Sequence, residues 1–420
     1  MSSSKDRLAV GLTGSFGSGC SSMKEALSKL GFTSVSLSQY VKDIWCKRTG
    51  KSIEEAIRPE LQDIGNELRE KNGKGHLAQL AVTEAIEKTN GETPLVFDNI
   101  RNLGEVEYFR KEFPNFFLIA LDCSPTVRWE RVKERYRKLR RDEDDFEDDD
   151  RRDKYEEWTK HGQQVELCVD DADVLIDNDE AFPTKTVTIN KLRAKIEGYI
   201  NLMKGNLRPP TSFESYMNMA YSNSLMSQCI KRRVGAVIVD EKKDAVLAVG
   251  YNENPHPMEP CISKYFQCYR DVYKASYFKE LERRGETCPK CDAKIEDLDY
   301  PFLCPKCNFD LDRHFIKDKA MNRCTALHAE EKAIMNAGSR NIEGCTLYTT
   351  TFPCFTCSQK IVYSKIASVV YVEPYPDPDS IRLLQECKIS VRRFEGVKAK
   401  AFFRLFGPWR REMEESYSGR

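Results

Sequence analysis

The chain has 420 residues, with 66 Lys or Arg and 66 Asp or Glu, so its formal net charge is zero. Proteins that wrap nucleic acid usually carry a basic excess, because phosphate contacts supply most of their affinity. The balanced charge therefore argues against a dedicated nucleic-acid binder. The length exceeds one average domain and 40% of the residues are hydrophobic, so two or three domains with real cores are expected.

The sequence has no apolar run of about 18 residues, so no membrane span is expected. Its first residues, "MSSSKDRLAV", lack the apolar core of a signal peptide. These features predict a cytoplasmic protein. In that compartment the 16 cysteines are expected to be reduced thiols and metal ligands rather than disulfides.

The first half alternates apolar strands with helices. Strands are expected at residues 7–14, 94–100, 115–123 and 172–179, and helices at 104–113, 125–141 and 190–204. This order indicates a parallel sheet with helices on both faces. Pro209 and Pro210 mark the boundary. We expect a first domain over residues 1–207 and a second over 208–420.

A Gly-rich loop, "GSFGSGCS", follows the first strand at residues 14–21. It has the outline of a phosphate-binding loop, G-x-x-x-x-G-K-[ST], but Cys20 stands where the lysine belongs. Backbone N–H groups and the helix dipole can still hold phosphate, whereas the missing cation normally assists phosphoryl transfer. We therefore expect a bound nucleotide that is not turned over. The expected contacts are Gly14, Gly17, Gly19, Cys20 and Ser21. A decayed loop kept for packing and an active kinase are the alternatives.

Asp98 ends the next apolar strand, the usual place for a carboxylate that works with magnesium. The segment "DNIRNLGEVEYFR", residues 98–110, resembles P-loop deoxynucleoside monophosphate kinases. The resemblance implies that the helix at 125–141 is a lid whose Arg131 and Arg135 lie near phosphates. It leaves open whether Mg²⁺ accompanies the nucleotide. The acidic run at residues 140–153 predicts a solvated, mobile lobe.

The second half mixes a hairpin with strands and helices. We expect a helix at 213–230, hairpin strands at 234–240 and 245–252, further strands at 345–350 and 367–373, and helices that begin at His328 and Cys354. These elements predict an α/β domain. A loop-rich insertion, residues 255–323, interrupts it.

The strongest motif of the chain joins "HAEEKAI", from His328, to "FPCFTC", which ends at Cys357. This H-x-E and P-C-x-x-C pair resembles the signature of zinc nucleobase deaminases. His328, Cys354 and Cys357 would hold Zn²⁺ and leave a fourth position for water. Glu330 would carry a proton from that water to the base. A closed structural zinc site is disfavoured, because it would need a fourth protein ligand.

Residues 212–395 resemble the cytidine deaminase fold, and specifically deoxycytidylate deaminases. The resemblance rests on "RRVGAVIVDEKKDAVLAVGYNENP", "RCTALHAEEKAI" and "TTTFPCFTC". It implies hydrolytic deamination of dCMP or dCTP. It also implies that Asn252 contacts the sugar and that backbone around Ala329 reads the cytosine edge. Transfer-RNA adenosine deaminases share the zinc motif but more often show "EPCxMC".

A P-loop kinase-like domain joined to such a deaminase resembles the antiviral, phage-defence cytidine deaminases of bacteria. The resemblance implies depletion of dCTP during infection, a regulatory first domain with a nucleotide effector, possible control by an RNA or protein, and a homo-oligomer. Two alternatives remain open. One is a polynucleotide deaminase that binds RNA or single-stranded DNA through residues 128–141 and the insertion. The other is a regulatory nucleotide-binding protein with an inert deaminase fold.

The insertion carries "CPKC" twice, within residues 285–310. The four cysteines are Cys288, Cys291, Cys304 and Cys307. Two such knuckles at this separation indicate a zinc ribbon, since four thiolates close a tetrahedral structural site. The expected role is stability, with substrate or partner binding as an alternative. Cys261, Cys268 and Cys324 are expected to be small buried thiols rather than further ligands.

Overall fold

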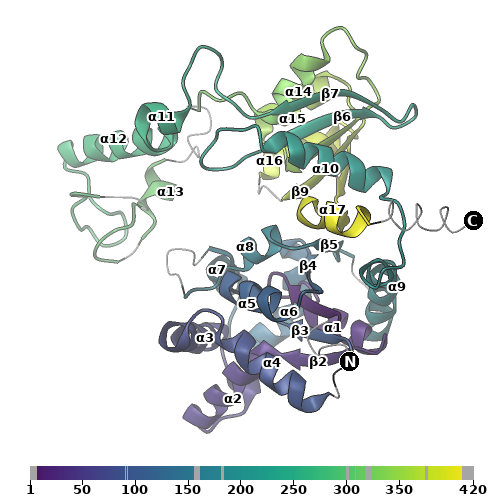
Figure 1. Cartoon of the computed structure of the whole chain (residues 1–420). Coiled ribbons are helices and arrows are strands. Elements are labelled where there is room, and N and C mark those ends of the chain that lie inside the picture. The colour runs from purple at the N-terminus through teal and green to yellow at the C-terminus, as the bar shows by residue number, and fades with distance from the viewer. Residues whose placement is uncertain are drawn as a thin grey trace, which may run out of the picture. The chain divides into compact units, whose positions relative to one another are not determined.

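The computed structural model describes residues 7–89, 91, 93–155, 161–180, 184–298, 302–307, 309–316, 324–373 and 377–408. The chain forms two compact units, which Figure 1 shows with their elements labelled. The first unit contains the chain up to Glu214 and again from Phe394 onward. The second is Ser215–Arg393.

The first unit is built on a six-stranded sheet of order β11-β5-β4-β1-β3-β2. Its strands are β1 (Ala9–Thr13), β2 (Thr33–Ser36), β3 (Leu95–Asp98), β4 (Phe116–Asp122), β5 (Val174–Asp177) and β11 (Gly396–Val397). Strands β1 to β5 pair in parallel, as predicted, and β11 joins β5 antiparallel. All five residues of β1 are buried, which explains why this central strand is apolar throughout.

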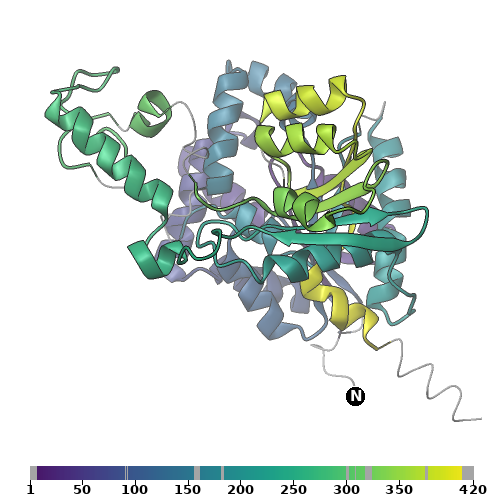
Figure 2. The same cartoon turned by 90° about the horizontal axis from the view of Figure 1, so that it is seen from above.

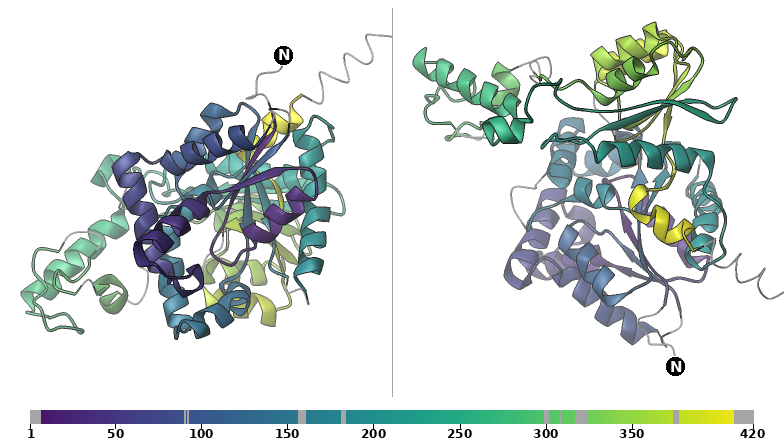
Figure 3. Two further views of the ribbon diagram at one scale, coloured as in Figure 1. Left: turned by 90° about the horizontal axis from the view of Figure 1, so that it is seen from below. Right: turned by 45° about the horizontal axis from the view of Figure 1, so that its top comes forward.

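Helices flank this sheet on both faces (Figure 3). They are α1 (Cys20–Ser28), α2 (Leu37–Thr49), α3 (Arg58–Asn72), α4 (His76–Lys88), α5 (Leu103–Glu112), α6 (Pro125–Lys138), α7 (Glu143–Tyr155), α8 (Val165–Asp170) and α9 (Lys185–Met203), with a 3₁₀ turn at Ile53–Glu55. One core joins Val10 and Leu12 of β1 to Met23 of α1 and Ile196 of α9. None of the described helices is both long and apolar enough to cross a membrane.

The order of the strands explains where a ligand can enter. β1 pairs with β3 on one side and with β4 on the other. The connections therefore diverge at β1, and in open α/β sheets the crevice beyond the carboxyl ends of such strands is the usual binding site. The Gly-rich loop begins at this end of β1.

The end of the chain belongs to the first unit, whereas the sequence predicted one second domain over residues 208–420. Strand β11 extends the first sheet, and its Val397 N–H donates to Glu214 Oε1 at 3.1 Å. Helix α17 (Ala399–Phe406) buries Leu405 in the core of the first unit, and Figure 1 shows this helix beside β5. Apolar residues on one face of α17 cause this return, because they need a core to cover them.

The second unit has a five-stranded sheet of order β10-β9-β8-β6-β7. The elements are β6 (Gly235–Asp240), β7 (Ala245–Tyr251), β8 (Thr346–Thr351), β9 (Ser368–Glu373), β10 (Ser390–Arg393), α10 (Ser212–Ser224), α14 (Ala329–Ala337), α15 (Phe355–Tyr363) and α16 (Pro378–Glu386). β6 and β7 form the predicted antiparallel hairpin, while β8, β9 and β10 run parallel to one another. Apolar residues of α14 and α15 cover the sheet.

The insertion contains more helix than its sequence predicted. It holds α11 (Cys261–Tyr265), α12 (Tyr269–Arg283) and α13 (Leu311–Phe315). Phe278 and Leu281 of α12 pack on the cysteine knuckles and form a small separate core with Cys288 and Cys304. Figure 2 shows α11 and α12 to one side of the sheet of their own unit. Helix α12 was not predicted because its sequence is mostly polar and only a short stripe of its residues is buried.

Replacing Leu405 with Ala should destabilise the first unit. Leu405 is 4% exposed in the core that contains β1, so the lost methyl groups leave a cavity that costs about 2–5 kcal/mol. Urea unfolding followed by circular dichroism measures the change. Phe403→Ala in the same helix is the matched control, since Phe403 is 74% exposed. Equal stability losses in the two variants would contradict the docking of α17.

Candidate active site and metal centres

Two helix N-termini bring the predicted ligands together. His328 is the N-cap residue of α14, and Cys354 is the N-cap residue of α15, with Cys357 in the first turn. His328 Nδ1 lies 3.3 Å from both sulfurs. These three donor atoms lie within 4.8 Å of one another, which suits a single metal ion. An imidazole and two thiolates are a ligand set that Zn²⁺ prefers.

Glu330 lies directly beside these donors. Its side chain is buried, and one carboxylate oxygen lies 3.6 Å from the Cys357 sulfur. The other oxygen accepts a hydrogen bond from Thr349 Oγ1 at 3.4 Å. Burial raises the pKa of Glu330 above its usual value. The structure therefore places a carboxyl group that can exchange a proton at this cluster.

The two thiols are electrostatically unequal. The neighbouring Cys357 and His328 lower the pKa of Cys354 to about 4. The neighbouring Cys354, together with burial, raises the pKa of Cys357 well above the usual value. Both sulfurs would bind a metal ion as thiolates, and their position at the N-terminus of α15 favours that charge.

The neighbouring Glu331 positions His328, a role that the sequence analysis missed. Its Oε2 accepts a hydrogen bond from the His328 backbone N–H at 3.0 Å. Glu331 also forms an ion pair with Lys360 of α15. The spacing from His328 to Glu331 is that of a capping box, and this spacing could have predicted the contact. The pair ties the two ligand-bearing helices together.

Asn252 and Ala329, the two residues expected to contact substrate, lie near this centre in the fold. Ala329 is buried at the start of α14. The backbone of Glu253 exchanges two hydrogen bonds with Leu327, which brings the end of β7 beside His328. The Asn252 side chain accepts from the Val234 N–H at 2.8 Å and donates to a neighbouring carbonyl. Its amide therefore fixes the start of β6. The sugar contact itself stays a prediction.

The four cysteines of the insertion form a second cluster. The Cys288 and Cys307 sulfurs are 3.7 Å apart, and those of Cys291 and Cys304 are 3.6 Å apart. All four sulfurs lie within 4.8 Å of one another. Four converging thiols fit a closed tetrahedral zinc site. Among the described residues, Cys261, Cys268 and Cys324 belong to neither cluster.

The three glycines of the Gly-rich loop have backbone angles that other residues rarely adopt. Gly14, Gly17 and Gly19 all have positive φ angles, 150°, 83° and 108°. A side chain at Gly19 would collide with Asn178, because its Cβ would lie 2.3 Å from Asn178 Nδ2. Burial raises the pKa of Cys20 to about 11, so this thiol stays neutral at pH 7 and does not replace the missing lysine charge.

Three side chains hold the outer face of this loop. Arg128 Nη1 donates to the Phe16 carbonyl at 3.0 Å, Arg131 Nη1 to the Gly17 carbonyl at 3.2 Å, and Asn178 Nδ2 to the Ser18 carbonyl at 2.6 Å. Within the loop the Ser18 N–H already donates to the Ser15 carbonyl at 2.9 Å, so only the other loop N–H groups could bind phosphate. The loop opens into a cavity of about 850 Å³ that Arg131 and Arg135 also line. The structure thus brings both predicted lid arginines to the loop.

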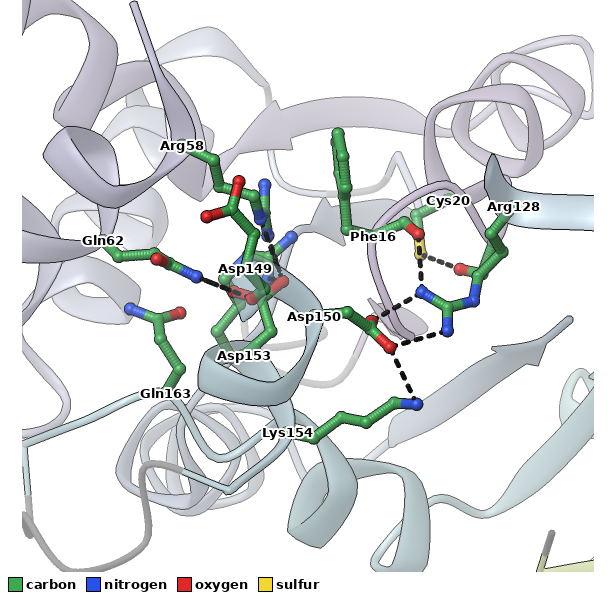
Figure 4. Close-up of polar contacts among 12 residues, drawn as sticks. Phe16, Cys20, Arg58, Gln62, Arg128, Asp149, Asp150, Asp153, Lys154 and Gln163 are labelled. Carbon is green, nitrogen blue, oxygen red and sulfur yellow. Dashed lines mark hydrogen bonds and ion pairs between the residues drawn. The ribbon is translucent and has the colours of Figure 1, made fainter. Parts of the chain in front are cut away.

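The acidic run, which the sequence predicted to be solvated and mobile, forms helix α7 instead. Asp153 is fully buried and forms ion pairs with Arg58 and Arg101. Asp150 accepts two hydrogen bonds from Arg128, at 2.5 and 2.8 Å. Figure 4 shows these carboxylates of α7 pointing into the basic cluster. Arginines that lie far away in sequence order this segment, and a local count of charges could not reveal them.

Asp98 is at the predicted place, the end of β3, and is fully buried. Its Oδ2 lies 3.0 Å from Lys24 Nζ of α1. Lys24 is one helical turn beyond Cys20 and was missed by the sequence analysis. A cation therefore does lie near the loop, but it contacts the carboxylate where magnesium was expected.

Comparison with known proteins identifies both halves of the chain. Residues 210–373 match the family model of the cytidine and deoxycytidylate deaminase zinc-binding region. Residues 10–154 match the model of an AAA domain. The predicted fold class, a kinase-like α/β domain followed by a cytidine-deaminase-like domain, is confirmed.

Three relatives illustrate the similarity. The deoxycytidylate deaminase of Saccharomyces cerevisiae is 33% identical over 191 residues, 45% of this chain and 46% of that protein. That of Schizosaccharomyces pombe is 30% identical over 212 residues, 49% of this chain and 52% of that protein. The UPF0200 protein TK1334 of Thermococcus kodakarensis is 34% identical over 132 residues, 31% of this chain and 69% of that protein. The chain spans about half the length of the two deaminases it matches.

Acid should destabilise the protein through Asp153. Burial alone would raise the pKa of Asp153, but Arg101 and Arg58 outweigh it and lower the pKa to about 2. A lowered pKa stabilises the fold above the usual carboxyl range near 4, and this contribution, on the order of 2 kcal/mol, is lost as the pH falls toward 2. Urea unfolding from pH 7 to pH 2 should show a shallower acid loss in Asp153→Asn than in the wild type.

Asp153→Asn should also be less stable at pH 7 by about 3–5 kcal/mol, because two buried arginines lose their counter-charge. Asp148→Asn on the same helix is the control, since the Asp148 side chain is 73% exposed. A parallel pH dependence in wild type and Asp153→Asn would contradict the buried pairing.

Proposed function

We propose that this chain, which belongs to the UPF0200 protein family, is a zinc-dependent hydrolase. It carries a deoxycytidylate deaminase domain and a kinase-like domain. The enzyme converts free dCMP, dCTP or both to the deoxyuridine nucleotide. The observation that carries this proposal is the buried Glu330 carboxylate beside the cluster of His328, Cys354 and Cys357. A structural metal site has no use for such a group.

The reaction replaces the C4 amino group of cytosine with oxygen from water and releases ammonia, with no change of oxidation state. His328, Cys354 and Cys357 would hold a Zn²⁺ ion, whose charge would make a water molecule easier to deprotonate. Glu330 accepts a proton from the water, delivers it to the ring nitrogen N3, and returns a proton to the departing amine. Its raised pKa suits both directions of transfer, because a strongly acidic carboxyl would hold no proton to give.

Thr349 and Glu331 support this role from either side. Thr349 Oγ1 lies 3.4 Å from one oxygen of Glu330 and 3.0 Å from the Thr351 carbonyl, so it helps to fix the position of the carboxyl group. Glu331 fixes the His328 backbone and links α14 to α15. Asn252 and the backbone at Ala329 are the groups we assign to the nucleotide, the first to its sugar and the second to the cytosine edge.

Cytosine nucleotides are the substrates we favour because the similar proteins of Saccharomyces cerevisiae and Schizosaccharomyces pombe are deoxycytidylate deaminases. We assign the kinase-like domain a regulatory role, since Cys20 supplies no charge for phosphoryl transfer. We further propose that the enzyme depletes dCTP as a defence against phage, which is what the resemblance to phage-defence cytidine deaminases implies.

Replacing Glu330 with Gln should abolish most activity while leaving the metal in place. Loss of the proton carrier should lower kcat for dCMP by about 10²–10⁴-fold. Ammonia release measures the rate, and elemental analysis measures the zinc. Glu343→Gln is the matched control, since the Glu343 side chain is 57% exposed. Full activity of Glu330→Gln would contradict the mechanism, and conversion of cytosine only in oligonucleotides would contradict the substrate.

Replacing Cys304 with Ser should remove the zinc ion of the insertion and leave the zinc ion at His328 in place. The two donor clusters lie in separate cores, so zinc should fall from two ions per chain to about one while dCMP deamination persists. Elemental analysis and ammonia release measure the two effects. Cys387→Ser is the control, because Cys387 is exposed. Unchanged zinc content would contradict the ribbon, and loss of both ions would contradict its independence.

A further inference from the structure

The cavity at the Gly-rich loop is more basic than its missing lysine suggests. Eight basic side chains line it: Lys42, Arg58, Arg69, Arg101, Arg131, Arg135, Arg141 and Lys185. The lining contains a single carboxylate among the described residues, that of Glu130. Such a surface attracts an anion. The arrangement of its charges indicates the kind of anion and whether it binds with a metal ion.

Most of these cations already have partners. Asp153 pairs with Arg58 and Arg101, as Figure 4 shows for Arg58, and Asp149 pairs with Arg141. The remaining pairs are Arg69 with Glu105 and Lys185 with Glu25, while Arg131 donates to the carbonyls of the loop. These contacts explain why the cluster is stable without a ligand.

Lys42 and Arg135 differ from the rest. No described carboxylate lies within ion-pair distance of either side chain, and the contact of Arg135 is a 3.4 Å hydrogen bond to the Ala56 carbonyl. Burial lowers the pKa of Lys42; Asp98 partly offsets this effect, whereas the positive charges of Arg135, Lys24 and Arg101 add to it. Lys42 is half-buried and Arg135 is exposed, and a phosphate chain bound at the Gly-rich loop would neutralise both charges.

The residues do not fit the Mg²⁺ ion that usually accompanies a nucleotide in a P-loop. The expected ligand, Asp98, is fully buried, its Oδ2 lies 3.0 Å from Lys24 Nζ, and neither of its oxygens has a hydrogen-bond partner among the described residues. Lys42 is close enough to Asp98 to interact with it electrostatically. A divalent cation would have to displace one ammonium and approach another, both in a site of low dielectric constant. The charge that magnesium would provide is present in the protein itself.

We propose that this cavity binds the phosphate chain of a nucleoside triphosphate without a divalent metal. Lys24 takes the electrostatic place of Mg²⁺ at Asp98, Lys42 and Arg135 bind phosphate oxygens, and the loop from Gly14 to Ser21 supplies N–H donors. Neither the loop lysine nor the metal is then available for phosphoryl transfer, so the nucleotide is held and not consumed. This inference goes beyond the proposed deaminase reaction.

Isothermal titration of the zinc-loaded full chain with ATP tests the proposal. ATP is the probe because it has no cytosine, so failure of the deaminase assignment would leave this measurement unaffected. The titration is run in metal-depleted buffer and again with excess MgCl₂, without a chelator that would remove zinc. Binding should be at least as tight without Mg²⁺. Absence of binding, or binding that is about tenfold tighter with Mg²⁺, would overturn the proposal.

Two variants test whether the effect of Mg²⁺ on ATP affinity depends on the charge of Lys24 rather than on a general loss of stability. Lys24→Gln leaves Asp98 unpaired and should make ATP affinity depend on Mg²⁺ by about tenfold. The double variant Lys24→Gln/Asp98→Asn removes both charges and should lose that dependence again. Lys29→Gln, an exposed position beyond the same helix, is the control. If Mg²⁺ has as little effect on the ATP affinity of Lys24→Gln as on that of the wild type, Lys24 does not take the place of the metal ion and the proposal is overturned.

Discussion

Burial of the Glu330 carboxylate against the His328, Cys354 and Cys357 donors is the constraint on which the second unit depends. An acidic group in that position is costly unless something compensates it. The fold supplies Thr349 as a hydrogen-bond donor, a histidine, and the N-termini of two helices. The hairpin must also approach closely, since a Cβ at Gly250 would lie 2.2 Å from the Ala329 carbonyl. The sheet and the two helices thus converge at Glu330, the residue proposed to transfer the proton.

The first unit must also compensate charged side chains, and there the charges are positive. Its basic residues converge on one cavity, and the acidic helix α7 neutralises several of them from within the chain. Cys20 stands where a phosphate-binding loop usually has lysine and supplies no positive charge, while Lys24 lies within ion-pair distance of Asp98. This charge distribution fits the binding of a nucleotide better than phosphoryl transfer. It is consistent with a regulatory role for the domain.

The sequence was most informative where chemistry requires fixed spacing. The H-x-E and P-C-x-x-C motifs identified every donor of the first cluster, and the two "CPKC" knuckles identified the second. Apolar runs predicted β1, β3, β4 and β5 because buried parallel strands must be apolar throughout. Long-range partners were not predictable. The folding of α7 depends on Arg58 and Arg101, the return of α17 on a distant core, and the role of Lys24 on a strand about 70 residues away.

The most direct test of the account is the fate of the cytosine amino group. The zinc-loaded protein is incubated with dCMP in water enriched in ¹⁸O, and the nucleotide product is examined by mass spectrometry. The account predicts dUMP that contains one ¹⁸O atom and an equal amount of ammonia. Unchanged dCMP, or a uracil product that carries no oxygen from water, would contradict it.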